Sequence, residues 1–476
     1  MLILFYKYWG KLFFIVAFVV LPRIVKAQLP LRLPSIISNH AVMQKSSLVK
    51  LWGWGPGSFT VNIICSWSKY DTIKIPIDAT CEWSTMVKTP SAAGPYDIDF
   101  MCGNQRISVK DILMGEVWLC SGQSNMEFNF RWGVSDTGNV LPTAKNNGIR
   151  FFQVQQNYNK FPQIDCNGSW VECDSNSASN FSVIGYLFGR HLNDRLKEPV
   201  GLIGSYWGGT GIQAWIPQPV FDNNFSLRQW AIHIEPYGWA PKGTSLLYNA
   251  MIFPITRYTL SGIVWYQGEA NVDREYNAYN ALFKAMINSW RVAFDKDLPF
   301  YFVQVAPWNG YKGIRAALLR EQQEMALRLP KTGMVVTSDL VDDTSDIHPR
   351  HKSVVALRLA NLALREVYGY NSINPYSPNI IKCIFHKGSV YITIKSVGKL
   401  SVLGDSIVGF QVAGFDKVFH LASGFIDNYG RVVVESKLVS LPTAVRYCFT
   451  NTTIPNLFDT NGLPLTPYRS DSWDNY

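Results

Sequence analysis

The sequence predicts an α/β protein in which a doubly wound, mostly parallel sheet is flanked by an N-terminal and a C-terminal all-β region. Between about residues 114 and 368, short apolar runs typical of buried strands alternate with longer stretches of helical periodicity. On either side of this segment, short alternating runs are separated by turn-forming clusters, which favours strands alone. With 476 residues, 47% of them hydrophobic, the chain can build more than one core.

Residues 1–27 have the pattern of a secretory signal peptide. Lys7 and Lys11 precede an apolar run over 12–21, and small residues near Ala27 offer a cleavage site. The run is too short for a comfortable membrane span, so we expect no stable membrane insertion after cleavage. We therefore expect a protein of the secretory pathway, either secreted or lysosomal.

The charge of the chain argues against nucleic-acid binding. The segment 1–27 holds four basic residues and no acidic one, so its removal lowers the formal net charge from +9 to +5. No run of lysine and arginine stands out in the remainder, which leaves a mildly basic surface without a nucleic-acid footprint.

The N-terminal region, 28–113, is expected to form a β-sandwich-like unit. Its alternating runs include 49–53, 60–64 and 107–109, and they are separated by turn clusters such as Gly55-Pro-Gly57. The C-terminal region, 369–476, returns to strand patterns at 390–394, 409–412 and 431–435.

The middle region, 114–368, is expected to hold the functional site. Buried strands are predicted at 117–120, 201–205, 262–266 and 300–305, and helices at 276–294 and 313–329. Ligands of such sheets bind at the carboxyl ends of the strands. Each motif described below follows one of these strands.

The first motif is Gly122-Gln-Ser-Asn125, which follows the apolar run Val117–Cys120. A serine in a tight turn between a buried strand and a helix holds its hydroxyl clear of the backbone, and the helix N-terminus leaves N–H donors free for an oxyanion. Ser124 is thus a candidate nucleophile. Serine and asparagine also favour helix N-caps, so the turn alone does not decide the role.

A second motif, Asp342-Asp-Thr-Ser-Asp-Ile-His348, follows a strand-like run over 333–340. A helix is expected to begin near His351. A serine and a histidine from two strand ends can meet, and a carboxylate can then fix the imidazole tautomer. His348 and Asp346 are the candidates. A surface histidine and a turn aspartate are the alternative interpretations.

Two further loops offer supporting groups. Tyr206-Trp-Gly-Gly-Thr-Gly211 lacks the lysine of a P-loop, which favours an oxyanion-hole loop, with Gly208 or Gly209 presenting an N–H group and Trp207 and Trp215 offering a wall for sugars. In Trp265-Tyr-Gln-Gly-Glu-Ala-Asn271, Gln267 could donate to an oxyanion, while Glu269 and Asn271 could orient a loop or bind sugar hydroxyls. Polar residues that cap the next helix are the alternative.

Other hydrolytic chemistries fit less well. Met126 occupies the last position of what would be the Gly-x-Ser-x-Gly pentad of α/β-hydrolases, and His348-Pro-Arg-His351 is a poor substitute for a zinc motif. A paired-carboxylate glycosidase using Glu269 and an aspartate of 342–346 would leave Ser124 without a role.

The cysteines and asparagines are consistent with secretion. Disulfides are expected between Cys166 and Cys173 and between Cys383 and Cys448, with Cys120 a buried free thiol. Asparagine glycosylation triplets begin at Asn167, Asn180, Asn224 and Asn451.

Taken together, the motifs resemble the sialate O-acetylesterases, within the wider group of SGNH-type carbohydrate esterases. The matching segments occur in family order and cover nearly the whole chain after residue 27. They are 33–44, 115–126, 207–211 with Ala214 and Trp215, 265–271, and 346–349 followed by Lys352.

The resemblance implies removal of O-acetyl esters from sialic acids or sialoglycans through an acetyl-enzyme, with no metal or organic cofactor. It assigns Ser124 as nucleophile and His348 as base. SGNH enzymes commonly place the acid three residues before the histidine, where this chain has Ser345. Asp346 is therefore our choice for the acid, with Asp342 and Asp343 as alternatives.

We expect Gly209 and Gln267, with the Ser124 N–H group, to hold the oxyanion, and Asn125, Trp207, Glu269 and Asn271 to contact substrate. Two alternative functions stay open: an acetylesterase for xylan or another neutral glycan, and a catalytically weak glycan-binding relative.

Overall fold

The computed structural model describes residues 29–473 except 69–70, 136, 139, 232–239 and 242. The predicted signal segment, 1–27, lies outside the described residues. Within the described part of the chain, no helix is both long and apolar enough to span a membrane.

A mixed α/β sheet forms the centre of the molecule, as the alternating pattern predicted. Its strands follow the order β13-β12-β11-β7-β10-β8-β9, and every neighbouring pair is parallel except β8 with β9. Their bounds are β7 Gln105–Gly122, β8 Asn146–Gln153, β9 Trp170–Cys173, β10 Val200–Tyr206, β11 Gly262–Tyr266, β12 Phe300–Val303 and β13 Thr332–Val335.

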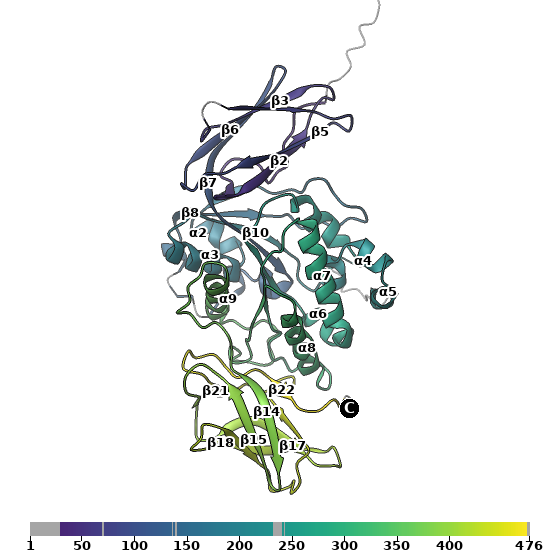
Figure 1. Ribbon diagram of the computed structural model, residues 1–476, viewed down its shortest axis with the longest axis vertical. Coiled ribbons are helices and arrows are strands. Elements are labelled where there is room, and N and C mark those ends of the chain that lie inside the picture. The colour runs from purple at the N-terminus through teal and green to yellow at the C-terminus, as the bar shows by residue number, and fades with distance from the viewer. Residues whose placement is uncertain are drawn as a thin grey trace, which may run out of the picture.

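Helices cover both faces of this sheet (Figure 1). The helices α3 (Val183–Leu196) and α9 (Lys352–Glu366) pack against each other on one face, and α7 (Tyr279–Ala293) and α8 (Arg315–Glu324) contact each other on the other. Successive strand residues point to opposite faces. Trp118 accordingly joins the apolar core beneath α3 and α9, and Leu119 joins the core on the other side.

Short helical turns connect these elements. The α-helical ones are α1 Ser124–Glu127, α2 Ser175–Asn180, α4 Gln218–Asp222, α5 Phe225–Ala231 and α6 Glu269–Val272. The 3₁₀ turns are η1 Phe130–Trp132, η2 Leu141–Thr143, η3 Ile212–Trp215, η5 Phe253–Ile255, η6 Tyr276–Ala278 and η7 Met325–Arg328, and η4 Tyr248–Ile252 is a π-type turn.

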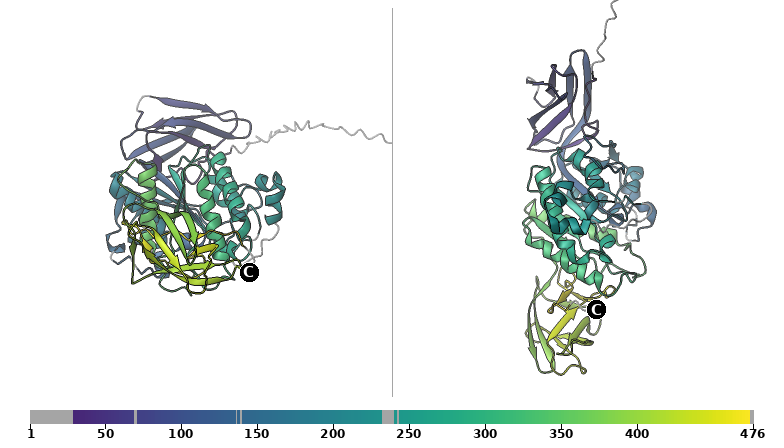
Figure 2. Two further views of the ribbon diagram at one scale, coloured as in Figure 1. Left: turned by 60° about the horizontal axis from the view of Figure 1, so that its bottom comes forward. Right: turned by 90° about the vertical axis from the view of Figure 1, so that its right-hand side faces the viewer.

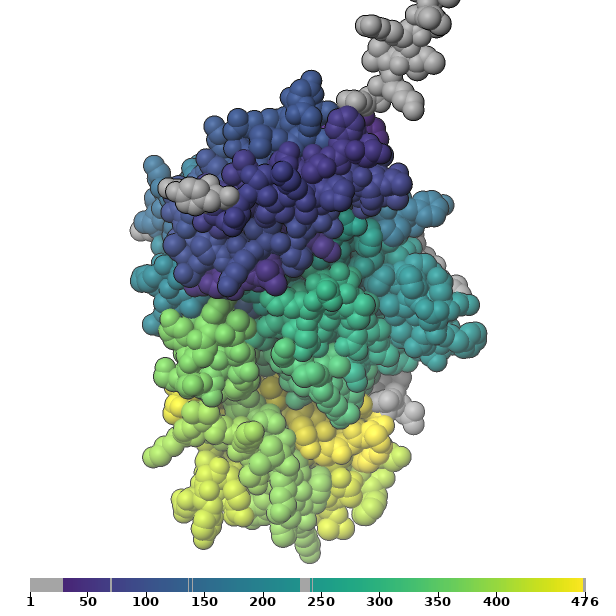
Figure 3. All heavy atoms as spheres, turned by 45° about the horizontal axis from the view of Figure 1, so that its top comes forward, coloured from purple at the N-terminus to yellow at the C-terminus, as the bar shows by residue number. Residues whose placement is uncertain are grey.

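The N-terminal β region and the core share one strand. The first half of β7 pairs with β6, with Tyr96 opposite Ile112, and its second half lies between β10 and β11. Figure 3 shows this region, in purple and blue, seated directly on the core. Its other strands are β1 Val42–Gln44, β2 Leu48–Trp54, β3 Thr60–Cys65, β4 Thr72–Pro76, β5 Glu82–Lys88 and β6 Tyr96–Cys102.

A separate antiparallel sheet forms the C-terminal region at the opposite end of the molecule (Figures 1 and 2). Its order is β14-β15-β19-β18-β17-β20-β22. The bounds are β14 Asn379–His386, β15 Ser389–Lys395, β17 Ile407–Ala413, β18 Phe419–Ile426, β19 Val432–Glu435, β20 Ala444–Tyr447 and β22 Tyr468–Arg469, with β16 Ser401–Val402 pairing β21 Leu457–Phe458.

A buried arginine joins the C-terminal region to the core. Arg320 of α8 is fully buried and donates hydrogen bonds to the carbonyl oxygens of Val305, Thr450 and Asn451. One side chain thus holds together the segments that follow β12 and β20.

The disulfide predictions are wrong for this structure, in which all eight cysteines are free thiols. Cys166 and Cys173 are close in sequence but lie in the cores on opposite faces of the sheet. The Cys383 sulfur lies 3.8 Å from the Tyr468 hydroxyl, whereas Cys448 packs against Gly409. Cys120 is buried and free, as expected.

One glycosylation triplet is also excluded by burial. The Asn451 side chain is buried, donates to the carbonyls of Tyr311 and Gly313, and accepts from the Ala316 N–H group. It therefore has no exposed amide for a glycan. The asparagines of the other three triplets, at 167, 180 and 224, are exposed.

Candidate active site

The candidate nucleophile lies where β7 gives way to a single helical turn. Gly122 has φ +139°, and a Cβ atom there would come within 2.1 Å of the Tyr266 carbonyl oxygen, so only glycine fits. The Gln123 N–H group then donates to the same carbonyl (2.9 Å). This close approach of β7 to β11 turns the chain sharply and places Ser124 at the start of α1.

His348 reaches this serine from the loop between β13 and α9. Its Nε2 atom lies 2.9 Å from the Ser124 hydroxyl oxygen, across 224 residues of sequence. Burial, together with the nearby positive charges of Lys352 and Arg350, lowers the pKa of His348 below its usual 6.5, and Asp346 opposes this shift. The imidazole is therefore neutral at pH 7 and able to accept the serine proton.

Among the three candidate acids, Asp346 is the one beside the histidine. Its Oδ1 atom accepts the His348 backbone N–H group at 2.9 Å and lies 3.8 Å from His348 Nδ1, a separation too long for a hydrogen bond. Asp342 pairs instead with His351 (2.7 Å), and Asp343 accepts from the Ser345 hydroxyl. Asp346 thus acts on the imidazole mainly through its charge.

The glycine loop after β10 lies against the nucleophile. A Cβ atom on Gly208 would lie 3.2 Å from the Ser124 Cβ atom. The Gly208 N–H group donates to Glu127 (2.7 Å) and is therefore not available to an oxyanion. Within the described residues, the N–H groups of Ser124 and Gly209 have no acceptor, and Gly209 has φ +67°, which favours glycine.

The structure does not support Gln267 as an oxyanion donor. Its side chain is fully buried, and its amide nitrogen donates to the Thr210 carbonyl (3.1 Å) and to Asn271 Oδ1 (2.8 Å). Its amide oxygen accepts from the Tyr279 hydroxyl. Because both amide hydrogens are used within the protein, Gln267 holds the glycine loop in place instead.

Asn271 is likewise an internal residue and not a substrate contact. Its Oδ1 atom accepts from the Ile212 N–H group and from Gln267, and its Nδ2 atom donates to Gln213 and Glu275. This amide has used its hydrogen-bonding capacity, so none remains for a sugar hydroxyl.

Asn125 and Glu269 are also buried and bonded to each other. Asn125 Nδ2 donates to Glu269 Oε1 at 2.5 Å, and Lys352 Nζ donates to Asn125 Oδ1 at 2.6 Å. The two predicted substrate contacts therefore belong to a buried chain beneath the nucleophile. In the sequence, Lys352 lies where a helix is expected to begin, and a lysine at such a position is usually exposed to solvent.

Trp207 alone among the predicted substrate contacts is partly exposed. Its ring centroid lies 6.3 Å from that of Tyr158, a residue 57% exposed that the sequence analysis did not identify. Trp215 is fully buried, with its indole N–H group donating to Thr210, so it belongs to the core and not to a sugar-binding wall.

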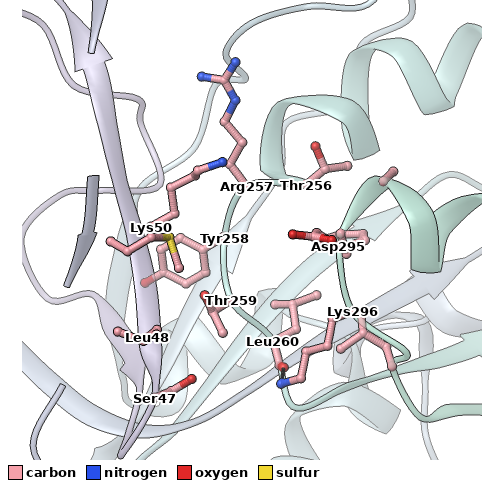
Figure 4. Close-up of a pocket in the computed structure, with 14 residues that line it drawn as sticks. Ser47, Leu48, Lys50, Thr256, Arg257, Tyr258, Thr259, Leu260, Asp295 and Lys296 are labelled. Carbon is pink, nitrogen blue, oxygen red and sulfur yellow. Dashed lines mark hydrogen bonds between the residues drawn. The ribbon is translucent and has the colours of Figure 1, made fainter. Parts of the chain in front are cut away.

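Two cavities differ in their relation to these residues. A cavity of about 200 Å³ beside His348 is lined by Asp342, Asp343, Asp346, His348, Pro349 and Arg350. Another, of about 210 Å³, lies between β2 and the segments 256–260 and 293–298, and no candidate catalytic residue lines it (Figure 4). There, Lys296 donates to the Leu260 carbonyl and the Tyr258 hydroxyl to the Val42 carbonyl, so both side chains have structural partners.

A serine hydroxyl bonded to a histidine at the carboxyl edge of a parallel sheet is the arrangement of serine-dependent ester hydrolases. Residues 114–365 match the family described as carbohydrate esterase, sialic acid-specific acetylesterase. The chain belongs to this family and is a carboxylic ester hydrolase.

The relatives cover most of the chain. The sialate O-acetylesterase of Homo sapiens is 31% identical over 423 residues, 79% of each protein, and that of Mus musculus is 29% identical over 78% of this chain and 79% of its own. A crystal structure of a carbohydrate acetylesterase from Xanthomonas citri has a TM-score of 0.84 and 33% identity, covering 93% of this chain and 100% of the other.

Replacing Gln267 by methionine is expected to lower stability more than catalysis. Losing the buried amide leaves the Thr210 carbonyl without a donor, whereas the Tyr279 hydroxyl keeps the Gln267 backbone carbonyl as its acceptor, so the free energy of unfolding should fall by about 1–3 kcal/mol. The turnover of the folded protein should fall less than tenfold. Urea denaturation and active-site-titrated kinetics measure the two effects. A hundredfold loss of turnover in a stable variant, typical of a lost oxyanion donor, would contradict our interpretation.

Among the acids, Asp346→Asn is expected to lower kcat/KM by roughly ten- to a hundredfold, less than the ~10⁴-fold known for a triad acid bonded to its histidine. Asp342→Asn, which removes a carboxylate paired with His351, serves as the matched control and should change kcat/KM less than threefold, by our rough estimate for a rim charge. Equal losses in the two variants would show that neither carboxylate is specific to His348.

Proposed function

We propose that this protein is a sialate O-acetylesterase, a serine hydrolase that removes O-acetyl groups from sialic acids through an acetyl-enzyme. The contact of 2.9 Å between Ser124 Oγ and His348 Nε2 carries the proposal. Family membership supports the reaction class, and the curated relatives named sialate O-acetylesterase support the substrate.

In the first step, Ser124 Oγ attacks the acetyl carbonyl carbon while His348 Nε2 takes the serine proton. The tetrahedral intermediate collapses, the bond from the acetyl carbon to the sugar oxygen breaks, and His348 returns the proton to that oxygen. The sugar hydroxyl leaves, and the acetyl group remains on Ser124.

In the second step, His348 removes a proton from water, and the resulting nucleophile attacks the acetyl-enzyme. Collapse of the second intermediate releases acetate and returns the proton to Ser124. In both intermediates, the N–H groups of Ser124 and Gly209 are the oxyanion donors that we propose, since both lack an acceptor within the described residues.

The substrate's sugar rings are proposed to lie against Trp207 and Tyr158. Trp207 follows β10 next to the nucleophile turn, and its N–H group donates to the Gly122 carbonyl (3.1 Å). Tyr158 shares the exposed edge of this pair. Aromatic rings with one exposed face and a nearby ester-cleaving serine suit the apolar face of a pyranose.

A neutral glycan is the second candidate substrate, and the charges of the cavity beside His348 favour it. Three aspartates line that cavity, and its one basic side chain, Arg350, already contacts Asp346 (3.1 Å) and the carbonyls of Trp132 and Gly133. An anionic sialic acid would have to share Arg350 with Asp346 or bind a cation elsewhere, whereas an acetylated xylan needs neither.

The wider organisation follows from the same proposal. We assign 114–368 as an SGNH-type, doubly wound catalytic domain between the β regions 28–113 and 369–476. We also propose a secretory route for the chain, supported by the signal pattern at 1–27.

Purified protein lacking residues 1–27 is expected to release acetate from 9-O-acetylated sialic acid, and Ser124→Ala should lower this release by at least about 10³-fold. Acetylated xylo-oligosaccharide, tested in parallel, separates the two substrates. Release that persists in Ser124→Ala would show that the nucleophile is another residue. Release from the xylan substrate alone would favour the neutral glycan.

Tyr158→Ala is expected to lower kcat/KM for an acetylated oligosaccharide by about tenfold, because one stacking face is lost. The same variant should hydrolyse p-nitrophenyl acetate, which has no sugar, at the wild-type rate. Tyr429→Ala is the matched control, because Tyr429 is 84% exposed on the C-terminal region. Equal loss on both substrates would exclude a sugar-binding role for Tyr158.

A further inference from the structure

A lysine is buried directly beneath the catalytic pair. Lys352, the first residue of α9, is fully buried, and its ammonium lies 4.7 Å from the centre of the Phe128 ring and 5.6 Å from that of Tyr266. The Phe128 ring in turn lies 6.0 Å from the His348 ring. Burying an ammonium is costly unless hydrogen bonds and an opposite charge compensate it, so this position calls for a functional explanation.

Asn125, the residue after Ser124, connects Lys352 to the carboxylate of Glu269. Lys352 Nζ donates to Asn125 Oδ1, and Asn125 Nδ2 donates to Glu269 Oε1. Asn125 Nδ2 also donates to the carbonyl of Ile347, the residue before His348, at 3.2 Å. One amide thus connects the ends of β7 and β11 to the histidine loop.

Glu269 is only partly satisfied in this arrangement. It is buried, and its second oxygen, Oε2, has no hydrogen-bond partner within the described residues. Burial raises the pKa of Glu269, while the hydrogen bond from Asn125 and the charge of Lys352 oppose that shift. Glu269 and Lys352 are therefore linked electrostatically, although the Asn125 amide lies between them.

The other charges around His348 lie on its own loop and on the elements packed against it. Asp346 and Arg350 flank it, Asp342 and Asp343 line the cavity beside it, and Glu127 of α1 is bonded to Gly208. Lys352 differs from all of these because it is fully buried, so solvent screens its charge least.

We propose that Lys352 is a positioning residue that acts through Asn125 and Glu269: it holds the three loops of the catalytic site together, and its buried charge keeps His348 deprotonated under acidic conditions. The inference rests on the proposed function of Ser124 and His348. A buried cation disfavours the positively charged imidazolium form of His348. The neutral base therefore persists to lower pH. The same positive charge also favours the oxyanion that forms when Ser124 attacks.

The test compares two substitutions that remove opposite charges. In Lys352→Met the acid limb of the pH dependence of kcat/KM should move up by about one pH unit, a tenfold change in proton concentration. In Glu269→Gln, which retains an oxygen acceptor for Asn125, the limb should stay in place or move down. A merely structural effect would lower the rate in both variants without moving the acid limb of Lys352→Met upward, and that result would contradict the inference.

Titration of His348 by NMR reports the pKa of its imidazole directly, without substrate. The chain has seven histidines, and His348→Gln assigns the signal in protein labelled on histidine. Lys296→Met is the matched control, because the Lys296 ammonium also donates to an amide oxygen, the Leu260 carbonyl, but lies away from the site. It should leave the His348 titration unchanged.

The outcomes separate this inference from the proposed function. An unchanged His348 titration in Lys352→Met overturns the inference even when acetate release is normal. A shifted titration in a protein that cleaves no acetyl ester supports the inference about the histidine and contradicts the proposed function. If Lys352→Met fails to fold, Lys352→Gln replaces it, because glutamine is neutral and keeps an N–H donor for Asn125 Oδ1, and an unshifted His348 titration in that variant overturns the inference.

Discussion

The position of Ser124, the proposed nucleophile, depends on the contact between the end of β7 and β11. Gly122 approaches the Tyr266 carbonyl so closely that no side chain fits, and the next N–H group bonds to that same carbonyl. The turn is therefore fixed by backbone atoms of two parallel strands. Because β7 is central in the sheet, the glycine loop after β10 and the loop after β11 necessarily lie on either side of it.

Most of the polar side chains around the site form hydrogen bonds within the protein. Gln267, Asn271, Asn125 and Glu269 are buried and bonded to one another or to neighbouring loops, while the hydroxyl of Ser124 faces His348. Buried hydrogen-bonded networks of this kind fix loops that have no regular backbone pairing. The loops can then present a few unpaired N–H groups with little freedom to move.

The sequence predicted the α/β core and the location of the motifs, because apolar periodicity and strand ends are local signals. It could not separate polar residues that face a substrate from those that bond to each other: Gln267 and Trp207 both follow strands, yet one is buried and the other partly exposed. It also placed Cys166 and Cys173 together, because spacing does not reveal that the sheet separates them. Lys352 was named as part of a motif, but its burial was not predicted, because it depends on Phe128 and Tyr266, which are distant in sequence.

The sharing of β7 between two regions has a consequence for how the chain folds during synthesis. The first half of β7 pairs with β6, which precedes it by a few residues. Its second half can pair only after β10 and β11, which begin at Val200 and Gly262, have been synthesised. Local pairing forms early, and parallel pairing across long loops forms late. The N-terminal β region can thus assemble first on the ribosome and hold β7 as the template on which the later strands dock.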